Sequence, residues 1–543
     1  MNDTTKHDVI IIGAGPAGLQ AADQLVAEGL NVKIIERGEG VGTFFRKFPR
    51  HRTFISINKA HTGLSLAEQR LRFDWNSLLS ADGPLFPDHS KKYFPRADTF
   101  VEYMEIYAER LEGMIDCNTE ISCIARAGDE FVLTCTDGRI YEANQVVVAT
   151  GVSMPWIPDV DGFEHVDLYA EFDPDPDLYT DKRVLILGKG NSAFETADSL
   201  IETTQSIHVM SPNPVKFAWN THFVGHLRAV NNNFLDTYQL KSQNALIDAT
   251  PTKIEKRGDE IIVTASMSAA EGHEIVLAYD HVIACTGFRF DASILDESIK
   301  PEMKHFGKFP AMMPNWECPN VPGLWFAGTI TQSNDFKKTM SGFVHGFRHN
   351  VASLSTFVAA RAKGEAYPTD MVGLATAELA DEIRDRISVS AAMFLQPGFL
   401  GDVIRIDGLH AGQRHRDVPV DWVRDEILPE GEHLMVTLEF GNFGSNPMHV
   451  KRQHTIEGTP DPFIHPVLRH YKDGKLLATT HISDHLDSDW RDPDQRDPGT
   501  VQAMTYVDHG ETLPPYEAAK RQLTAFLLQQ NIGSSAIGMA AAE

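Results

Sequence analysis

The chain carries two glycine-rich turns, each placed between an apolar strand and a helix, and this pair constrains the fold more than any other feature. The first unit runs from His7 to Glu36 and the second from Lys182 to Met210. Turns of this kind hold the pyrophosphate of a dinucleotide at the N-terminus of the helix that follows. We therefore predict an α/β fold class with two Rossmann-like dinucleotide-binding domains.

The first turn fits the pattern G-x-G-x-x-G and follows an apolar run from Asp8 to Ile12. We expect Gly13 to permit the tight turn, Gly15 to let the backbone approach the pyrophosphate, and Gly18 to let the helix pack closely on the strand. The cofactor-binding residues predicted in this turn are Gly13, Ala14, Gly15, Pro16, Ala17 and Gly18.

An acidic residue ends the strand after this helix, because Glu36 stands 23 positions beyond Gly13. A carboxylate at this place accepts hydrogen bonds from ribose hydroxyls and repels a 2′-phosphate. We expect Glu36 and the adjacent Arg37 to contact the cofactor.

The second turn fits G-x-G-x-x-A, where the alanine permits slightly looser packing of the helix on the strand. The next strand, from Ser206 to Met210, ends without an acid, which favours NADPH and does not exclude NADH. Lys216 and Arg228 are the nearest candidate cations for a 2′-phosphate. The alternative is a unit that keeps the fold and binds nothing. The predicted contacts are Gly188, Gly190, Asn191, Ser192 and Ala193.

Some flavoproteins have two dinucleotide-binding domains, and their chain crosses from one domain to the other at two short A-T-G segments. Two segments of this sequence resemble these crossings: Ala149-Thr150-Gly151 and Cys285-Thr286-Gly287. In such proteins an FAD domain is interrupted by an NADPH domain, and the nicotinamide delivers a hydride to the flavin. The resemblance implies cofactor contacts from Thr150, Gly151, Thr286 and Gly287.

The same resemblance divides the chain into four parts. We expect residues 1–170 to form the first part of the FAD domain, residues 171–280 the NAD(P)H domain and residues 281–365 the second part of the FAD domain. Residues 366–543 mix helical and strand patterns and are predicted to be an α+β C-terminal region of unknown role.

A closer resemblance rests on seven longer segments: Pro49–Arg52, Ile55–Lys59, Asp74–Leu79, Gly190–Ala197, Leu235–Ser242, Gly342–Arg348 and Phe463–Val467. They are similar to the FAD-dependent oxidoreductase family that includes the endoplasmic-reticulum flavoprotein associated with degradation. Neither a signal peptide nor a retention tetrapeptide is present, so we expect a cytoplasmic, bacterial-type relative without the luminal role.

The late strand from Gly323 to Gly328 resembles the strand that closes the flavin site in these proteins. Gly328 is therefore expected to contact the cofactor. Thr329 stands where many relatives carry an aspartate towards the ribityl chain, and Gln332 and Asp335 are possible substitutes. A helix beginning near Ser341 is expected to point its N-terminus at the flavin ring.

Asn58 and Lys59 fall where flavin-containing monooxygenases, which this region resembles, place a polar residue beside the oxygen adduct of the flavin. They are the predicted catalytic residues. The implied function is an NAD(P)H-using monooxygenase that hydroxylates an amine or amino acid through a C4a-hydroperoxyflavin. Small-molecule substrate and O2 are the predicted partners. For Asn58, a turn or cap residue is the alternative interpretation.

Two further functions stay open. The monooxygenase fingerprint F-x-G-x-x-x-H is not intact between Phe163 and Phe172, which leaves a flavin reductase, dehydrogenase or oxidase without oxygen insertion. Residues 366–543, which no dinucleotide motif requires, leave a flavin-bound scaffold for a partner protein. A disulfide reductase is disfavoured because none of the five cysteines stands in a C-x-x-C pair.

The loop from Arg46 to Arg52 is a dense basic run in a chain of formal net charge −26. Arg50 in this loop is predicted to neutralise cofactor phosphates or to steer an anionic substrate, and a solvated charged loop is the alternative. His481 and His485 have i, i+4 spacing but lie in a loop-like segment, so we predict no metal site.

The acidic charge balance disfavours nucleic-acid and anionic-membrane partners. No apolar run reaches the ~18 residues of a membrane span, so no membrane association is expected. A homo-oligomer remains open.

Overall fold

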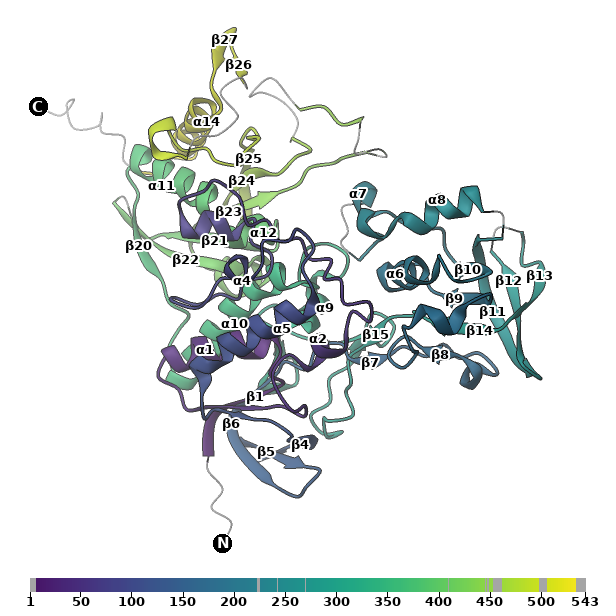
Figure 1. The fold of residues 1–543 in the computed structure, drawn as a ribbon. Helices are drawn as coiled ribbons and strands as arrows, with labels where there is room; N and C mark the ends of the chain where they lie inside the picture. Colours follow the sequence, from purple (N-terminus) through teal and green to yellow (C-terminus); the bar gives the residue numbers. More distant parts are fainter. Residues whose placement is uncertain are drawn as a thin grey trace, which may run out of the picture.

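The computed structural model contains three domains (Figure 1). The two glycine units lie in separate domains, and the C-terminal region forms a third. This arrangement confirms the predicted α/β fold class. The structure describes residues 6–221, 225–241, 243–268, 270–408, 410–444, 446, 449–452, 461–497 and 505–533.

The first dinucleotide domain is built on a sheet with the parallel order β3-β2-β1-β6-β19. An antiparallel meander of β4 and β5 extends from β6, and β18 pairs with β19. The strands are β1 (Lys6–Ile12), β2 (Val32–Ile35), β3 (Ile115–Asp116), β4 (Ile121–Ala127), β5 (Glu130–Cys135), β6 (Ile140–Val148), β18 (Glu317–Cys318) and β19 (Val321–Phe326).

Helices α1 and α10 pack against each other on this domain, and α5 contacts α1. Strand β1 is almost fully buried, as a central parallel strand requires. A small hairpin of β16 (Met303–Lys304) and β17 (Phe309–Pro310) precedes β18. The helices are α1 (Pro16–Ala27), α2 (Thr43–Lys47), α3 (Ala67–Leu71), α4 (Phe86–His89), α5 (Ala97–Ala108), α9 (Gln332–Asp335) and α10 (Val344–Lys363).

The second dinucleotide domain stands to the right in Figure 1 and carries the sheet β13-β12-β11-β10-β9-β14-β8. Strands β11, β10, β9, β14 and β8 run parallel, and β12 and β13 form an antiparallel extension. Its elements are β8 (Asp167–Leu168), β9 (Arg183–Leu187), α6 (Asn191–Leu200), β10 (Ser206–Ser211), α7 (Ala218–Thr221), α8 (Asn233–Leu240), β11 (Ala245–Arg257), β12 (Glu260–Met267), β13 (Glu274–Tyr279) and β14 (His281–Ala284).

The borders of this domain differ from the predicted borders at residues 170 and 280. Both β8 and β14 belong to the second sheet, and β14 lies between β9 and β8. Hydrogen bonding to β9 continues through β14, so the chain leaves the domain only after Ala284. The crossings themselves meet in a short antiparallel pair of β7 (Met154–Pro155) and β15 (Phe288–Arg289).

The C-terminal region is an α+β domain with the antiparallel sheet β20-β22-β21-β23-β24-β25, and helices α11 and α14 pack together on it. Its elements are β20 (Asp370–Gly373), α11 (Thr376–Val389), α12 (Ala391–Leu395), β21 (Leu400–Ile406), β22 (Ala411–Pro419), α13 (Val420–Trp422), β23 (Glu432–Glu439), β24 (His465–Lys472), β25 (Lys475–His481), β26 (Tyr506–Asp508), β27 (Glu511–Leu513) and α14 (Pro515–Gln529).

A buried arginine joins the C-terminal domain to the first dinucleotide domain. The Arg72 guanidinium donates to the carbonyl oxygens of Ile387 (2.6 Å), Ser390 (3.1 Å) and Ser488 (2.6 Å). Arg72 is 1 % exposed, and burial lowers its pKa to about 9. Three backbone acceptors from one domain thus depend on one side chain of the other.

Among the described helices, no stretch of apolar residues is long enough to cross a bilayer.

Candidate cofactor and active site

The first glycine turn leaves free space at only one of its three glycines. Gly13 has φ +102°, and a Cβ there would come within 2.9 Å of the Ala149 carbonyl oxygen. A Cβ on Gly18 would lie 2.0 Å from the Gly13 carbonyl oxygen, so α1 packs directly on the turn. A Cβ on Gly15 would meet nothing within 4 Å. Gly15 therefore faces open space, as a close approach to pyrophosphate requires.

Helix α1 begins at this turn without a side-chain cap. Gly15 is its N-cap residue, and Pro16 occupies the first helical position. The N–H groups at the start of a helix need partners, and they carry the positive end of the helix dipole. Ala14 and Ala17 complete the turn, and both are buried.

Glu36 lies at the end of β2 and is 5 % exposed. Its carboxylate accepts hydrogen bonds from the Ala14 N–H (2.8 Å), the Gly38 N–H (2.8 Å) and the Thr43 hydroxyl (2.9 Å). These donors fix the carboxylate beside the glycine turn. The neighbouring Arg37 is exposed.

The second turn repeats the first at two positions. Gly188 has φ +123°, and a Cβ there would lie 2.3 Å from the Cys285 carbonyl oxygen. A Cβ on Gly190 would meet nothing within 4 Å. At the third position Ala193 is fully buried, so its methyl group fits between helix α6 and the sheet. Helix α6 begins at Asn191 without a side-chain cap.

The Asn191 side chain holds the loop that follows β10. Its Oδ1 accepts from the Arg228 backbone N–H (2.9 Å) and from the Asn231 amide (3.2 Å), and its Nδ2 donates to the His226 carbonyl (3.0 Å). Arg228 is therefore positioned by the second turn. Lys216, the other cation considered for a 2′-phosphate, lies in the same loop.

A lysine inside the second turn adds a cation that the sequence interpretation missed. Lys189 is 4 % exposed at its side chain and forms an ion pair with Asp248 on β11. Asp248 pairs in register with Ser211, the last residue of β10. An acid thus lies beside the end of β10, on the neighbouring strand, and it is neutralised by Lys189.

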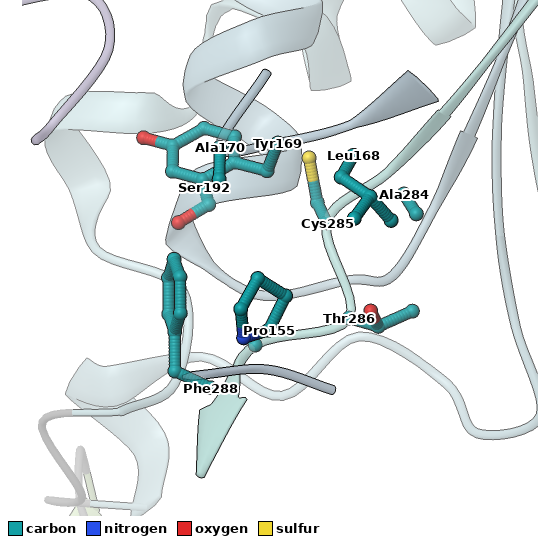
Figure 2. A pocket seen from close by; sticks show the side chains of 10 residues that line it. Pro155, Leu168, Tyr169, Ala170, Ser192, Ala284, Cys285, Thr286 and Phe288 are labelled. Atoms are coloured by element: carbon teal, nitrogen blue, oxygen red, sulfur yellow. The ribbon is translucent and has the colours of Figure 1, made fainter. Parts of the chain in front are cut away.

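A narrow pocket lies between the second turn and the second crossing (Figure 2). Ser192, Cys285 and Thr286 line it, with Gly287 beside them. Thr286 donates to the Trp156 carbonyl, and the Trp156 N–H donates to the Gly287 carbonyl (2.9 Å). These bonds tie the two crossings together at the edge of the pocket.

The first crossing presents a hydroxyl group without a partner. The Thr150 Oγ1 atom is buried and makes no hydrogen bond within the described ranges. Gly151 follows with φ +65° and open space around it. A buried hydroxyl group of this kind is expected to meet a ligand.

The late strand β19 leads into a short 3-10 helix, Gly328–Thr331, and then into α9. Gly328 has φ +79°, and a Cβ there would lie 2.8 Å from the Ala17 Cβ. Gln332 packs its amide on Gly342, just before α10. Asp335 is 1 % exposed, and burial raises the pKa of its carboxyl group.

Helix α10 begins at Val344, three residues beyond the predicted Ser341, and no side chain caps it. A buried amide network fixes the segment before it. Gln396 of the C-terminal domain donates to the Ser341 hydroxyl (2.9 Å) and to Asn350 Oδ1 (2.8 Å). The helix start is therefore held from the side of the C-terminal domain.

Asn58 is 3 % exposed and donates from Nδ2 to the Ser90 carbonyl (2.6 Å). Its Oδ1 is buried and has no partner in the part of the chain that the structure describes. Lys59 places its Nζ atom 3.6 Å from the centre of the Trp75 ring. Burial, together with the charge of Arg228, lowers the pKa of Lys59 to about 8.

The basic loop turns Arg50 towards the second domain. Its guanidinium donates to the Phe172 carbonyl (2.6 Å), and its backbone N–H donates to the Tyr169 hydroxyl (3.1 Å). His51 lies 3.3 Å from the Thr196 hydroxyl on α6, and burial lowers its pKa to about 4. The loop thus packs between the two dinucleotide domains, and contact of Arg50 with a cofactor phosphate stays a prediction.

Sequence interpretation missed Trp75 and His345 as site residues. Their rings stack with centres 4.4 Å apart, beside Lys59. Both lie in segments quoted for the family resemblance, which was the available signal. Nothing in the local pattern indicates that residues 270 positions apart meet.

His481 and His485 do not form a common site. His481 Nδ1 lies 2.9 Å from His465 Nε2, whereas His485 Nε2 lies 3.2 Å from the Arg496 guanidinium. Among the described residues, no group of three or more metal-ligating side chains comes together.

The geometry of the first turn fits FAD. Gly15 faces open space, α1 starts without a side-chain cap, Glu36 is fixed beside the turn, and the Thr150 hydroxyl group has no partner among the described residues. The second turn offers the same kind of opening at Gly190. The set of donors matches a dinucleotide at each turn.

Comparison with known proteins agrees with this geometry. Residues 10–328 match the family model for pyridine nucleotide-disulphide oxidoreductases. FAD-dependent oxidoreductase domain-containing protein 2 of Mus musculus is 33 % identical over 508 residues, which cover 86 % of this chain and 76 % of that protein.

Two solved structures show the fold. Bacillithiol disulfide reductase Bdr from Staphylococcus aureus has a TM-score of 0.53 and 21 % identity, and it covers 66 % of this chain and 99 % of its own. A flavin-containing monooxygenase from Stenotrophomonas maltophilia has a TM-score of 0.52 and 19 % identity, with the same coverage. By its family match and its identity to the mouse relative, this chain belongs to the pyridine nucleotide-disulphide oxidoreductase family, among its FAD-dependent oxidoreductases.

Proposed function

We propose that the protein is an FAD-dependent monooxygenase that uses NADPH and O2 to hydroxylate a small nucleophilic molecule. The proposal combines the family with three local features: two open glycine turns, a buried polar site at Asn58, and cysteines unsuited to dithiol chemistry. Bound FAD would supply hydride acceptance from the nicotinamide and, once reduced, reaction with oxygen.

The first domain is proposed to hold the FAD. Gly15 and the start of α1 would bind the pyrophosphate, and Glu36 would accept from the adenosine ribose. Thr150 and the segment before α10 would face the inner half of the cofactor. The uncapped start of α10 would stabilise negative charge on the ring.

The second domain is proposed to bring the nicotinamide coenzyme. Gly190 and the start of α6 would bind its pyrophosphate. Ser192 and Thr286 line the narrow pocket beside this turn. Lys189 neutralises Asp248 beside the end of β10, so no unpaired carboxylate from Asp248 would repel a 2′-phosphate there, which supports NADPH.

The observation that carries the oxygen chemistry is the Asn58 side chain. It is buried and fixed through Nδ2, and its Oδ1 has no partner within the described residues. A fixed amide in a site that excludes water can hold a reactive oxygen group long enough for transfer. Lys59 lies next to it and adds a positive charge.

Cysteine chemistry is disfavoured as the alternative. All five cysteines are free. Burial raises the pKa of Cys285, which lines the pocket of Figure 2, to about 12, so it is a neutral thiol at pH 7. A neutral buried thiol is a poor nucleophile for disulfide exchange.

Oxygen uptake by the purified FAD-loaded protein tests the proposal. NADPH should be consumed with O2 in a ratio near one, and hydroxylated product should appear in the same amount when candidate nucleophiles are added. Asn58→Ala should still be reduced by NADPH but should release hydrogen peroxide in place of product. The matched control, Asn144→Ala, changes an exposed asparagine on β6 and should behave like the wild type.

A reductase or dehydrogenase is the second candidate, because residues 163–172 lack the monooxygenase histidine and hold Phe172 against Arg50. Stoichiometric reduction of an organic acceptor without oxygen, together with absence of hydroxylated product for every nucleophile tested, would favour it.

A further inference from the structure

A column of rings and cations stands next to Asn58. His345 stacks on Trp75 with centres 4.4 Å apart and on Phe343 with centres 5.6 Å apart. The Lys59 Nζ atom lies over the Trp75 ring, 3.6 Å from its centre. We call Phe343, His345, Trp75 and Lys59 the ring column.

The ring column brings together three parts of the fold. Lys59 and Trp75 come from the long segment between β2 and α5, and Phe343 and His345 come from the start of α10. Arg228 comes from the second domain, where its backbone N–H donates to Asn191 of the second turn. Burial lowers the pKa of both Lys59 and His345, and the charge of Arg228 contributes to both shifts.

The positive charges at the column have no acidic partner. Neither Lys59 nor Arg228 forms an ion pair or a side-chain hydrogen bond within the described ranges. Asp74, the acid next to Trp75 in the sequence, is occupied by the Asn76 and Ser77 N–H groups and by the Ser77 hydroxyl. In a chain with an excess of 26 negative charges, two half-buried cations that pair with no carboxylate in the described part of the chain indicate a place for an anion.

Several polar atoms of the column and its neighbour are buried without a partner in the described part of the chain. They are Trp75 Nε1, His345 Nδ1 and Asn58 Oδ1. His345 is 2 % exposed and Asn58 is 3 % exposed. Native structures rarely leave such atoms unpaired, so their concentration beside one column points to a hydrogen-bonding ligand.

From this arrangement we propose that the ring column binds an aromatic carboxylate as the substrate: its ring packs against the column, and its carboxylate pairs with Lys59 and Arg228. The proposal rests on the proposed function, since it names the substrate class of the same site. Stacking suits an aromatic ring, and two cations favour a carboxylate over an ammonium group. A simple amine would be repelled.

The test measures binding to the oxidised, FAD-loaded protein by titration calorimetry. The probes share one skeleton: 3-phenylpropanoate, its neutral amide 3-phenylpropanamide, and 3-phenylpropan-1-amine. We expect the carboxylate to bind about tenfold or more tightly than the amide, and the amine to bind more weakly than both, since a charge-assisted pair contributes at least this ratio. Equal affinity for carboxylate and amide, or preference for the amine, would overturn the proposal.

Two substitutions locate the preference. Lys59→Met and Arg228→Gln each remove one charge and should each reduce the ratio of carboxylate to amide affinity severalfold, while the amide itself binds as before. The matched control is Lys308→Met, because Lys308 is also a half-buried lysine over a ring, 5.4 Å from the Phe309 centre, and lies outside the column. The ratio of carboxylate to amide affinity should be the same in Lys308→Met as in the wild type. The visible flavin spectrum checks that each variant is folded and loaded.

The same variants separate a substrate site from a coenzyme site. If Lys59→Met and Arg228→Gln weaken NADPH binding and leave the ratio of carboxylate to amide unchanged, the cations serve the coenzyme phosphates and the proposal is wrong. Binding needs no oxygen. A carboxylate preference would therefore support the ring column as a binding site even if no nucleophile in the oxygen-uptake assay gave hydroxylated product, a result that would count against the monooxygenase alone.

Discussion

The two glycine turns are alike at their first two positions and differ at the third. Gly13 and Gly188 both abut a carbonyl of a crossing, and Gly15 and Gly190 both face open space. At the third position, Gly18 lies so close to the Gly13 carbonyl that a methyl group has no room, whereas Ala193 is accommodated. The first turn is therefore the more tightly packed of the two.

The first dinucleotide domain is also attached more firmly to the rest of the molecule than the second. The C-terminal domain is fastened to the first domain through Arg72 and Gln396. The second domain is entered and left through two short crossings, and the basic loop packs against it. A tightly packed, fastened domain suits a cofactor that stays, and a domain joined by two crossings suits a coenzyme that comes and goes.

The largest effect is expected from Gly18→Ala. Its new methyl group would meet a backbone oxygen at 2.0 Å, so α1 must move, and we expect destabilisation of about 1–3 kcal/mol together with loss of FAD. The paired change Ala193→Gly should cost at most about 1 kcal/mol and leave FAD in place. Thermal unfolding and visible absorbance per polypeptide measure both. Equal losses of stability and of bound FAD in Gly18→Ala and Ala193→Gly would contradict the conclusion that the first turn is packed more tightly than the second.

A smaller and more selective effect is expected at the open positions. Gly15→Ala meets no protein atom within 4 Å, so the chain should fold, but FAD affinity should fall about tenfold or more because the methyl group occupies the approach of the pyrophosphate. Gly190→Ala should leave the FAD content unchanged and raise the NADPH concentration needed for half-maximal flavin reduction. A Gly190→Ala variant that loses FAD would show that the two turns do not bind separate cofactors.

A further effect concerns the pH dependence of stability in the second domain. Glu195 on α6 is 9 % exposed, and burial raises its pKa from 4.5 to about 8. Between these values the folded chain keeps a proton that the unfolded chain has lost. The free energy of unfolding should therefore fall as pH rises from 4.5 to 8, by up to about 1.4 kcal/mol per pH unit from this group.

Glu195→Gln removes this contribution, so its urea unfolding should depend less steeply on pH than that of the wild type. Glu202→Gln, which changes an exposed glutamate just after α6, is the matched control and should keep the wild-type slope. Identical slopes for Glu195→Gln and the wild type would mean that the carboxyl group is already ionised in the folded domain.

Sequence patterns predicted the parts of this structure that are local. Both glycine turns, the strand before each one and the late strand ending near Gly328 follow from short apolar runs next to glycines. The C-terminal α+β character also followed from mixed local patterns. What was missed depends on distant pairs. The place of β14 is set by pairing with β9 and that of β8 by pairing with β14, and the stacking of Trp75 on His345 joins segments 270 positions apart.

The candidate site shows the same limit. The sequence indicated Asn58 and Lys59 through a family resemblance, but gave no reason to expect an unpaired Asn58 Oδ1 or a lysine over an indole ring. Arg50 adds a contact that the sequence did not indicate. Its contact with a cofactor phosphate stays a prediction, and in the fold its guanidinium donates to the Phe172 carbonyl, a contact that depends on the packing of two domains.

The contact of Arg72 with three carbonyl groups has a practical consequence for shortening this protein. A chain that ended after Lys363 would leave the Arg72 guanidinium without its three acceptors and would expose the surface around α3, so the remaining two thirds should aggregate when produced alone. Exchange of the last third between relatives should succeed only when the donor brings a helix end of the same shape at Ile387 to Ser390, where α11 stops. The segment that contains Arg72 and the C-terminal domain that supplies its acceptors are therefore expected to occur together in relatives of this protein.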